Sequence, residues 1–309
     1  MEKLITALEV LFPIALAMTL GVVARKKGSI SKAGIEGMQK FVLNVALPFS
    51  LFNACLNGKF SSETLLPMVL TFLMLLISTL TAFRMRKRIG YSNLPMAFSA
   101  GEAGMIGLPL YMTLFPAEHT FRFAALQLSH LATAMPTLSI LTAEKDGKAL
   151  DTPALVKKVF TTPLLVGSLL GVIMNLSGGM RLLESIGLDT VLTKATSFMA
   201  APVSAVIVFV IGYTVDFSGE DLRAELRVCA ARFFLFALFC LILQGALLLV
   251  PDVVPETRWA VLLYYMLPAP YPMPALGKND SEQSFGSGVC SIGTVIALAV
   301  FCVMTVLTR

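Results

Sequence analysis

Long apolar runs, separated by short polar loops, recur from one end of the chain to the other. In LTFLMLLISTLTAF (70–83), apolar and polar residues do not alternate, which argues against the strands of a membrane barrel. Apolar runs of about 18 residues or more are typical of membrane-spanning helices. We predict ten such spans, with approximate bounds 4–24, 36–56, 65–84, 92–115, 121–142, 159–177, 191–215, 228–250, 257–277 and 284–307.

Composition points to the same class of protein. The 309 residues are 56% hydrophobic and 14% charged, with a mean hydropathy of +0.81, whereas soluble domains carry about 25% charged residues. The first apolar run is followed by ARKKG (24–28) in place of a cleavage site, so we interpret it as a retained span. The five cysteines are odd in number and form no CxxC pair, which favours packing residues over disulfides or a metal site. We expect an all-α protein embedded in the lipid bilayer of the cell membrane.

The loops differ in charge from one side to the other. Alternate loops carry fifteen Lys and Arg residues, among them Arg84 to Arg88, and the opposite set carries seven. Because basic loops stay in the cytoplasm, both termini are predicted to be extracytoplasmic, which requires an even number of spans. The basic residues that set the orientation in the membrane account for the net charge of +5, so we infer no nucleic-acid partner from that charge.

The two halves share a pattern of glycine and proline. Pro13 and Gly21 are eight residues apart in the first span, as are Pro163 and Gly171 in the sixth. A second set keeps its spacing in spans two and seven, where Lys40, Pro48, Ser50 and Gly58 correspond to Lys194, Pro202, Ser204 and Gly212. Five spans per half make the repeat inverted, as in many secondary transporters. Channels also carry such repeats, and glycine and proline are common in membrane helices. We divide the chain into repeats 1–142 and 159–309, joined by a cytoplasmic linker, 143–158.

Spans four and nine each contain residues that interrupt a helix. GEAGMIGLPL (101–110) combines three glycines, a proline and a glutamate, and LPAPYPMPAL (267–276) has four alternating prolines. Proline removes a backbone donor and clashes with the preceding turn, so an α-helix cannot continue through the second segment. Broken spans in corresponding positions indicate a transport site, where helix N-termini suit anions and freed carbonyls suit cations. A proline kink without a ligand is the alternative, chiefly for span four.

Ionisable residues within the spans are the candidates for coupling. Glu102 lies in the first interruption, and we identify no Lys or Arg at its depth. It is therefore expected to be protonated, ion-bound or in a wet cavity, which suggests proton coupling. The alternative is a protonated glutamate that bonds freed backbone groups. His130 lies near Gln127 on one face of span five, and helix packing is its alternative role. Asn44, Ser50 and Asn53 form a polar line in span two, for which interhelical hydrogen bonding is an equal alternative.

Three segments resemble the auxin efflux carrier family. FVLNVALPFSLFNA (41–54) is similar to its second span, GEAGMIGLPLYMTLF (101–115) to its fourth, and residues 264–301 to the last two spans of bacterial members. The resemblance implies ten helices in inverted repeats, as in sodium–bile acid symporters, with helices four and nine broken and crossing, and an elevator mechanism. It implies auxin-like or dicarboxylate substrates such as malate or malonate, and a substrate site lined by span two. The family's fourth-span Asn falls at Glu102, and the long central loop of plant members is absent here.

These observations predict a secondary transporter of a small organic anion. A sodium-coupled symporter is the main alternative, and a channel or facilitator is the next. The motifs HExxH, Walker A and GxSxG are missing from the sequence, so we do not expect an enzyme, a cofactor or a metal. A coupling H⁺ or Na⁺ and a homodimer both stay open. The candidate substrate-binding residues are Asn44, Pro48, Ser50, Glu102, Gly104, Gly107, Pro109, Gln127, His130, Pro268, Pro270, Tyr271 and Pro272.

Overall fold

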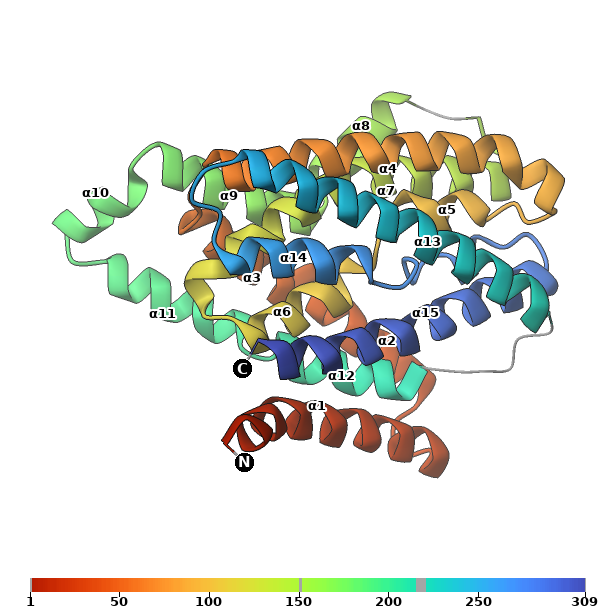
Figure 1. Cartoon of the computed structure of the whole chain (residues 1–309), viewed down its shortest axis with the longest axis horizontal. Coiled ribbons are helices and arrows are strands. Elements are labelled where there is room, and N and C mark those ends of the chain that lie inside the picture. Colours follow the sequence, from red (N-terminus) through yellow and green to blue (C-terminus); the bar gives the residue numbers. More distant parts are fainter. Residues whose placement is uncertain (1, 150–151, 215–220, 309) are drawn as a thin grey trace.

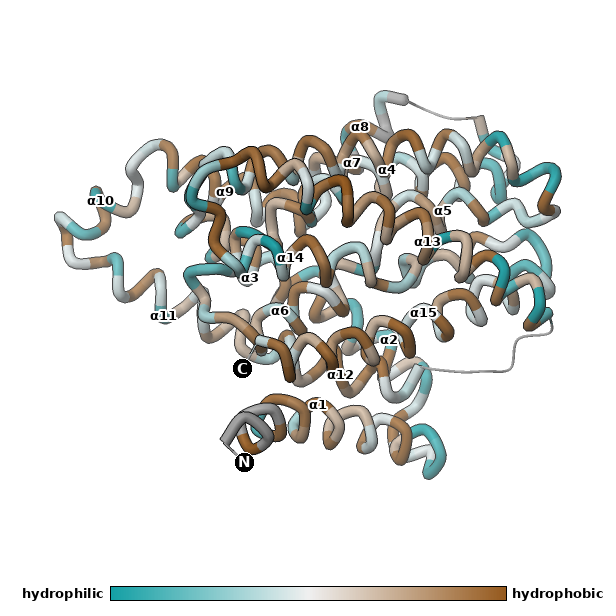
Figure 2. Tube along the Cα trace, in the orientation of Figure 1, coloured by the Kyte–Doolittle hydropathy of each residue, from teal (hydrophilic) through white to brown (hydrophobic). Residues whose placement is uncertain are grey.

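The computed structural model describes residues 2–149, 152–214 and 221–308, and all regular structure in these ranges is helical. Most helices lie side by side along the long axis, with both ends of the chain at the same end of the molecule (Figure 1). Polar residues gather toward the two ends of the bundle and apolar residues fill the middle (Figure 2). The expected all-α membrane protein is confirmed at this level.

Five helices of the described chain are long and apolar enough to cross a membrane, or six if a bent pair counts as one span. The bent pair is α9 (Pro163–Leu176) with α10 (Gly179–Ser185), which meet at 68°. A π-helix interrupts the α-helical pattern of predicted span two, breaks divide spans four and nine, and the polar residues of span five lower its hydropathy. The count of ten spans and the inverted repeat therefore stay predictions.

The first half begins with α1 (Glu2–Lys27). Predicted span two is one stack of α2 (Lys32–Phe41), the π-helix η1 (Val42–Ala46) and α3 (Leu47–Leu56), and Ser31 caps it by accepting a hydrogen bond from Gly34 N–H. Next comes α4 (Ser62–Ile89), which ends at Gly90 with a φ of 93°, a value that glycine adopts without strain. The remaining elements are α5 (Leu94–Ser99), the π-helix η2 (Ala103–Gly107), α6 (Leu108–Leu114), the 3₁₀ helix η3 (Ala117–His119) and α7 (Thr120–Lys145).

The second half begins with α8 (Thr152–Phe160), so the end of the predicted linker 143–158 is helical, and its residues 150–151 lie outside the described chain. After α9 and α10 come α11 (Asp189–Ala200), α12 (Val203–Thr214), α13 (Leu222–Ala246), the 3₁₀ helix η4 (Leu247–Leu249), α14 (Pro255–Tyr265), the 3₁₀ helix η5 (Pro274–Leu276) and α15 (Asp280–Leu307). Residue 215, the last of predicted span seven, is also outside it.

The helices pack as two groups. In the first group, α1 lies along α12, and α3 lies along α9 and α11. Glycines make these contacts close: a Cβ on Gly21 would collide with the backbone of Phe209, one on Gly212 with that of Met18, and one on Gly171 would lie 2.5 Å from the Phe52 carbonyl oxygen. In the second group, α4 packs on α5 and α7, and α13 packs on α14 and α15. Glycines without side chains let helix backbones approach, as is common between membrane helices.

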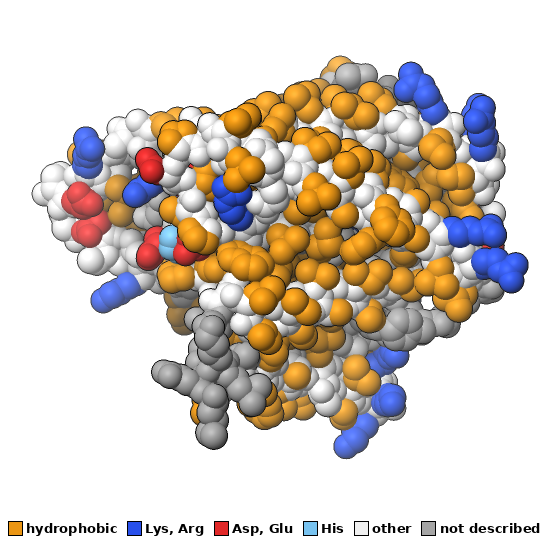
Figure 3. All heavy atoms as spheres, in the orientation of Figure 1, with side chains coloured by type: hydrophobic (Ala, Val, Ile, Leu, Met, Phe, Trp, Pro, Cys, Tyr) orange, Lys and Arg blue, Asp and Glu red, His pale blue; other side chains and the backbone are white. Residues whose placement is uncertain are grey.

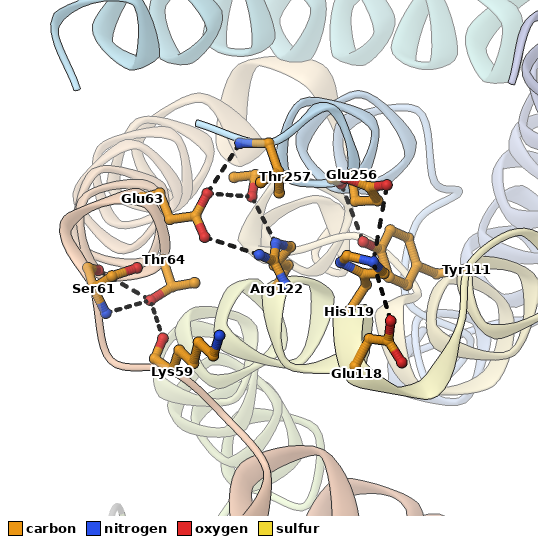
Figure 4. Close-up of polar contacts among 11 residues, drawn as sticks. Lys59, Ser61, Glu63, Thr64, Tyr111, Glu118, His119, Arg122, Glu256 and Thr257 are labelled. Atoms are coloured by element: carbon orange, nitrogen blue, oxygen red, sulfur yellow. Dashed lines mark hydrogen bonds and ion pairs between the residues drawn. The ribbon is translucent and has the colours of Figure 1, made fainter. Parts of the chain in front are cut away.

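Ion pairs join α4 and α7 near both of their ends. At one end Arg122 pairs with Glu63 at 2.9 Å, and Glu63 also accepts hydrogen bonds from Val254 N–H and the Thr257 hydroxyl at the start of α14 (Figure 4). At the other end Arg86 and Glu144 form two hydrogen bonds of 2.6 and 2.9 Å. These contacts make α4, α7 and the start of α14 one connected unit.

The face of the molecule shown in Figure 3 is broadly apolar. Large side chains such as Phe198 and Leu249 are mostly exposed, and an exposed apolar surface of this extent suits lipid tails. Lys and Arg side chains gather mainly at the end of the molecule opposite the chain termini (Figures 1 and 3).

Candidate functional site

The first helix interruption is centred on Glu102. Helix α5 ends at Ser99, Ala100 is fully extended, and helical structure resumes at Ala103. The Glu102 carboxylate caps the new helix by accepting a hydrogen bond of 3.3 Å from Met105 N–H. Pro109 lies in the first turn of α6, directly after the π-helix, and is not the point of interruption. The predicted break is confirmed, but glycine and glutamate form it.

The second interruption follows α14, which ends at Tyr265. Residues 267–270 have no regular structure, and a short turn leads to η5 at Pro274. Each proline lacks the N–H that an α-helix would need, and no α-helix continues through the segment, as the sequence predicted.

The two interruptions contact each other directly. The Glu102 N–H donates to the Pro268 carbonyl at 2.9 Å, and the Glu102 carboxylate accepts from Tyr271 N–H at 2.7 Å. The Tyr271 hydroxyl lies 3.1 Å from that of Thr294 on α15. Glu102 therefore satisfies backbone groups of both interrupted segments.

Arg232 of α13 corrects the expectation that no basic residue lies at the depth of Glu102. It is 5% exposed, and its guanidinium donates to the carbonyls of Ala97, Leu267 and Pro268. It also stacks on the Phe236 ring, 4.0 Å from the centroid. The Pro268 carbonyl thus accepts from both Glu102 N–H and Arg232. The signal was present in the sequence, because a lone arginine in an apolar span is by default a functional candidate.

A cavity of about 390 Å³ lies beside the contact between the two interruptions. Its walls come from the α2–η1 stack, the first interruption with η2, α7, the start of α9 and the second interruption. The structure brings eight predicted site residues together in its lining, namely Asn44, Glu102, Gly104, Gln127, His130, Pro270, Tyr271 and Pro272. Both π-helices contribute to the wall, and such segments are frequent at functional sites.

Two buried polar atoms in this wall lack a hydrogen-bond partner among the described residues. They are Oε1 of Gln127 and Nδ1 of His130. The two side chains are 1% and 7% exposed, respectively. Buried polar groups are nearly always hydrogen-bonded, so unpaired ones that line a cavity indicate a polar ligand or water. Together the pair offers one acceptor and one group that either donates or accepts, depending on the imidazole tautomer.

Five predicted residues do not line this cavity. Ser50 lies with Asn53 and Ser204 in a separate cavity of about 400 Å³, so the expected polar line of span two is divided. Pro48 packs its backbone against Gly167, and Gly107 is enclosed by the side chains of Phe123 and Leu267. Pro109 is buried in α6, and Pro268 contributes only the carbonyl described above.

A larger cavity of about 680 Å³ adjoins the site and shares Gln39 and Tyr271 with it. Arg25 and Lys32 line it, so it lies toward the end of the molecule with the basic loops. Four hydroxyl-bearing residues of α15, Ser284, Ser287, Ser291 and Thr294, give it a polar wall. The lining of this cavity therefore includes both basic residues of that end and Tyr271.

No three His, Cys, Asp or Glu side chains of the described residues form a group that would hold a metal ion. The freed carbonyls at the interruptions are the other place where a cation would bind. Arg232 already donates to three of them.

Comparison with known families supports a transport function for the first half of the chain. Residues 6–152 match the model of the family described as membrane transport protein, the auxin efflux carriers. The matched segment contains the first interruption, Asn44, Gln127 and His130, and the second interruption lies beyond it. A search of curated proteins found no match.

Proposed function

We propose that this protein is a membrane transporter that moves a small organic anion by alternating access, and the match of residues 6–152 to the membrane transport protein family supports this class. One observation carries the proposal: two interrupted helices meet at Glu102 beside a cavity with unpaired Gln127 and His130 atoms. Irregular backbone inside a membrane is tolerated only within protein or beside a water-filled cavity. The volume of the cavity lies within the range of small-molecule sites. Auxin-like acids and dicarboxylates such as malate or malonate are the substrate classes to test first.

Glu102 gives the proposal a coupling mechanism. Its carboxylate accepts from the N–H groups of Met105 and Tyr271, which are the donors that an anionic substrate would need. A substrate carboxylate reaches them only when the Glu102 carboxylate withdraws. Protonation weakens Glu102 as an acceptor and removes its repulsion of the substrate. One proton is therefore expected to accompany each substrate carboxylate that takes this place.

Sodium coupling is the second candidate, and Arg232 argues against it. The freed carbonyls of Ala97, Leu267 and Pro268 accept hydrogen bonds from a guanidinium, whose positive charge would also repel a sodium ion placed among them. Sodium prefers oxygen ligands of this kind, and these three are already used. Proton coupling therefore ranks first.

The two helix groups support an elevator-type movement. The cavity lies where the α2–α3 stack and α9 of one group face η2, α7 and the second interruption of the other. Ion pairs at both ends hold α4 to α7. The second group would therefore keep its internal contacts while it moved as one body relative to the first group. The larger cavity opens the site toward the basic end, which the positive-inside rule assigns to the cytoplasm. Both termini would then be outside.

Uptake into proteoliposomes tests the proposal. Purified protein is reconstituted, and entry of radiolabelled malate, malonate and indole-3-acetate is measured with an inward proton gradient, an inward sodium gradient and neither. We expect saturable accumulation above equilibrium with the proton gradient in choline buffer. Accumulation that requires sodium would favour the symporter alternative. Non-saturating flux that only equilibrates the substrate would favour a channel.

A further inference from the structure

A groove on the outer surface lies away from the transport cavity, between α4 and α13. Its volume is about 710 Å³, and α5 forms its floor with Leu94 and Phe98. The two helices diverge toward the basic end of the molecule, with α5 between them (Figure 1). The proposed transport function uses no side chain of this groove, so any ligand of the groove would differ from the transported substrate.

The walls of the groove are apolar along most of their length. Ile77 and Met85 of α4 face Leu235 and Phe239 of α13 across it, and Ile77 is 63% exposed. The hydroxyl groups in the wall are already used, because Ser78 donates to the carbonyls of Leu75 and Phe98 and Thr81 donates to that of Ile77. An occupant therefore meets hydrocarbon there, which matches an acyl chain.

The mouth of the groove is basic. Arg88 near the end of α4 and Arg227 in the second turn of α13 line it, and no Asp or Glu does among the described residues. Both arginines are exposed. Arg86, two residues before Arg88 and on another face of α4, is instead paired with Glu144. Guanidinium groups bind phosphate oxygens in a bidentate manner, so the two arginines suit a phosphodiester.

We propose that this groove is a binding site for one anionic phospholipid, with the headgroup phosphate between Arg88 and Arg227 and an acyl chain along α4 and α13. The charge and the apolar wall act together, because the basic residues stand at one end of an apolar slot that opens to the lipid-facing surface. The lipid would fill the space between α4 and α13, which contact each other directly elsewhere and both pack against α14.

Native mass spectrometry of the detergent-solubilised protein tests this. Phosphatidylglycerol and phosphatidylcholine with identical acyl chains are added at equal concentration, and glycerol phosphate serves as the headgroup without chains. We expect phosphatidylglycerol to be retained over phosphatidylcholine by a factor on the order of ten, and glycerol phosphate not to bind. Equal retention of the two lipids would overturn the proposal, as would binding of glycerol phosphate at the same strength.

Variants separate a specific site from a general charge effect. The double variant Arg88→Gln with Arg227→Gln should lose the preference for phosphatidylglycerol. The matched double variant Arg84→Gln with Arg223→Gln removes the same charge outside the groove lining and should keep it. Ala231→Trp, at an exposed position of the wall, should reduce retention of both lipids. An equal loss in the two double variants would contradict a site in the groove.

Discussion

The Glu102 carboxylate accepts a hydrogen bond of 2.7 Å from the backbone N–H of Tyr271, 169 residues further along the chain. Two interrupted segments, one from each half, are joined at this bond. The N–H groups that would receive an anion are thus occupied by an acid of the protein itself. Under the proposed function, such a site would change its affinity for anions when that acid gains a proton.

The first prediction concerns Glu102→Gln. Glutamine keeps the shape of the side chain but cannot ionise, so transport should lose its dependence on a proton gradient. In the wild type, initial uptake should rise as the external pH falls from 8 to 5, because protonation frees the Met105 and Tyr271 donors. Initial uptake rates in proteoliposomes across this pH range provide the measurement.

The matched control is Glu118→Gln, since the Glu118 side chain is 77% exposed at the end opposite the basic loops. Its pH profile should follow that of the wild type. A Glu102→Gln protein that transports with an unchanged pH profile would show that the coupling group is elsewhere.

Arg232→Met provides the second prediction. Methionine fills a similar volume but leaves the carbonyls of Ala97, Leu267 and Pro268 without this donor. Each buried carbonyl that loses its partner costs about 1–3 kcal/mol of folding free energy. The thermal unfolding midpoint of the variant should therefore be several degrees lower than that of the wild type. The thermal unfolding midpoint in detergent is the measurement. Arg232→Lys should recover part of the loss, because it keeps a donor and the charge.

Arg223→Met is the control for this variant, because Arg223 is exposed on the same helix and should tolerate the change. If Arg232→Met unfolded at the wild-type temperature, the guanidinium would not be holding the interruptions together.

The third prediction is that Gly21→Ala and Gly212→Ala each destabilise the α1–α12 contact. The added methyl group would collide with backbone atoms of Phe209 in one case and Met18 in the other, and backbone cannot move aside as a flexible side chain can. Overpacking typically costs about 1–3 kcal/mol, which should lower the unfolding midpoint.

Gly37→Ala is the matched control for both glycine variants, because a Cβ there meets no atom within 4 Å and the position is helical and exposed. It should be neutral or stabilising by up to about 1 kcal/mol, since alanine favours helix more than glycine does. Equal effects at Gly21, Gly212 and Gly37 would contradict close packing between α1 and α12.

The sequence predicted the interruptions well because their cause is local. Four alternating prolines prevent a helix whatever surrounds them, and GEAG offers little helix propensity. The sequence also indicated Glu102, Gln127 and His130 as candidates, but their position on one cavity depends on how α7 packs against the interruptions. The sequence analysis does not identify Arg232 as a residue near Glu102, because it lies close to the end of a long apolar span. Its charge within that span was the more informative feature.

The division of the polar line in span two could have been found by geometry. At 3.6 residues per turn, Asn44 and Ser50 are about 120° apart around a helix and point toward different faces. The π-helix at Val42–Ala46 further changes the angle between these two side chains, and no single residue in that segment predicts a π-helix. The close approach of α1 to α12 depends on which helices meet, which the glycine spacing alone could not specify.

The last prediction concerns the ion pair of Arg86 and Glu144, which lies beyond predicted span five. The hydrogen bonds from Arg86 hold the pKa of the Glu144 carboxyl below its usual value, despite a smaller opposing effect of burial. Because the pKa in the folded state is depressed, the pair stabilises the fold fully above the unfolded pKa of about 4.3. That contribution is lost as the pH falls through the lower folded value.

A double-mutant cycle with Arg86→Gln and Glu144→Gln should therefore give a coupling free energy of about 0.5–1 kcal/mol at pH 7, falling toward zero below pH 4. Unfolding in detergent at the two pH values measures it. The exposed Lys148–Asp146 pair serves as the comparison and should show almost no coupling at either pH, because water screens it. A coupling energy for Arg86 and Glu144 that stayed constant down to pH 3 would mean that the helices are joined by packing and not by charge.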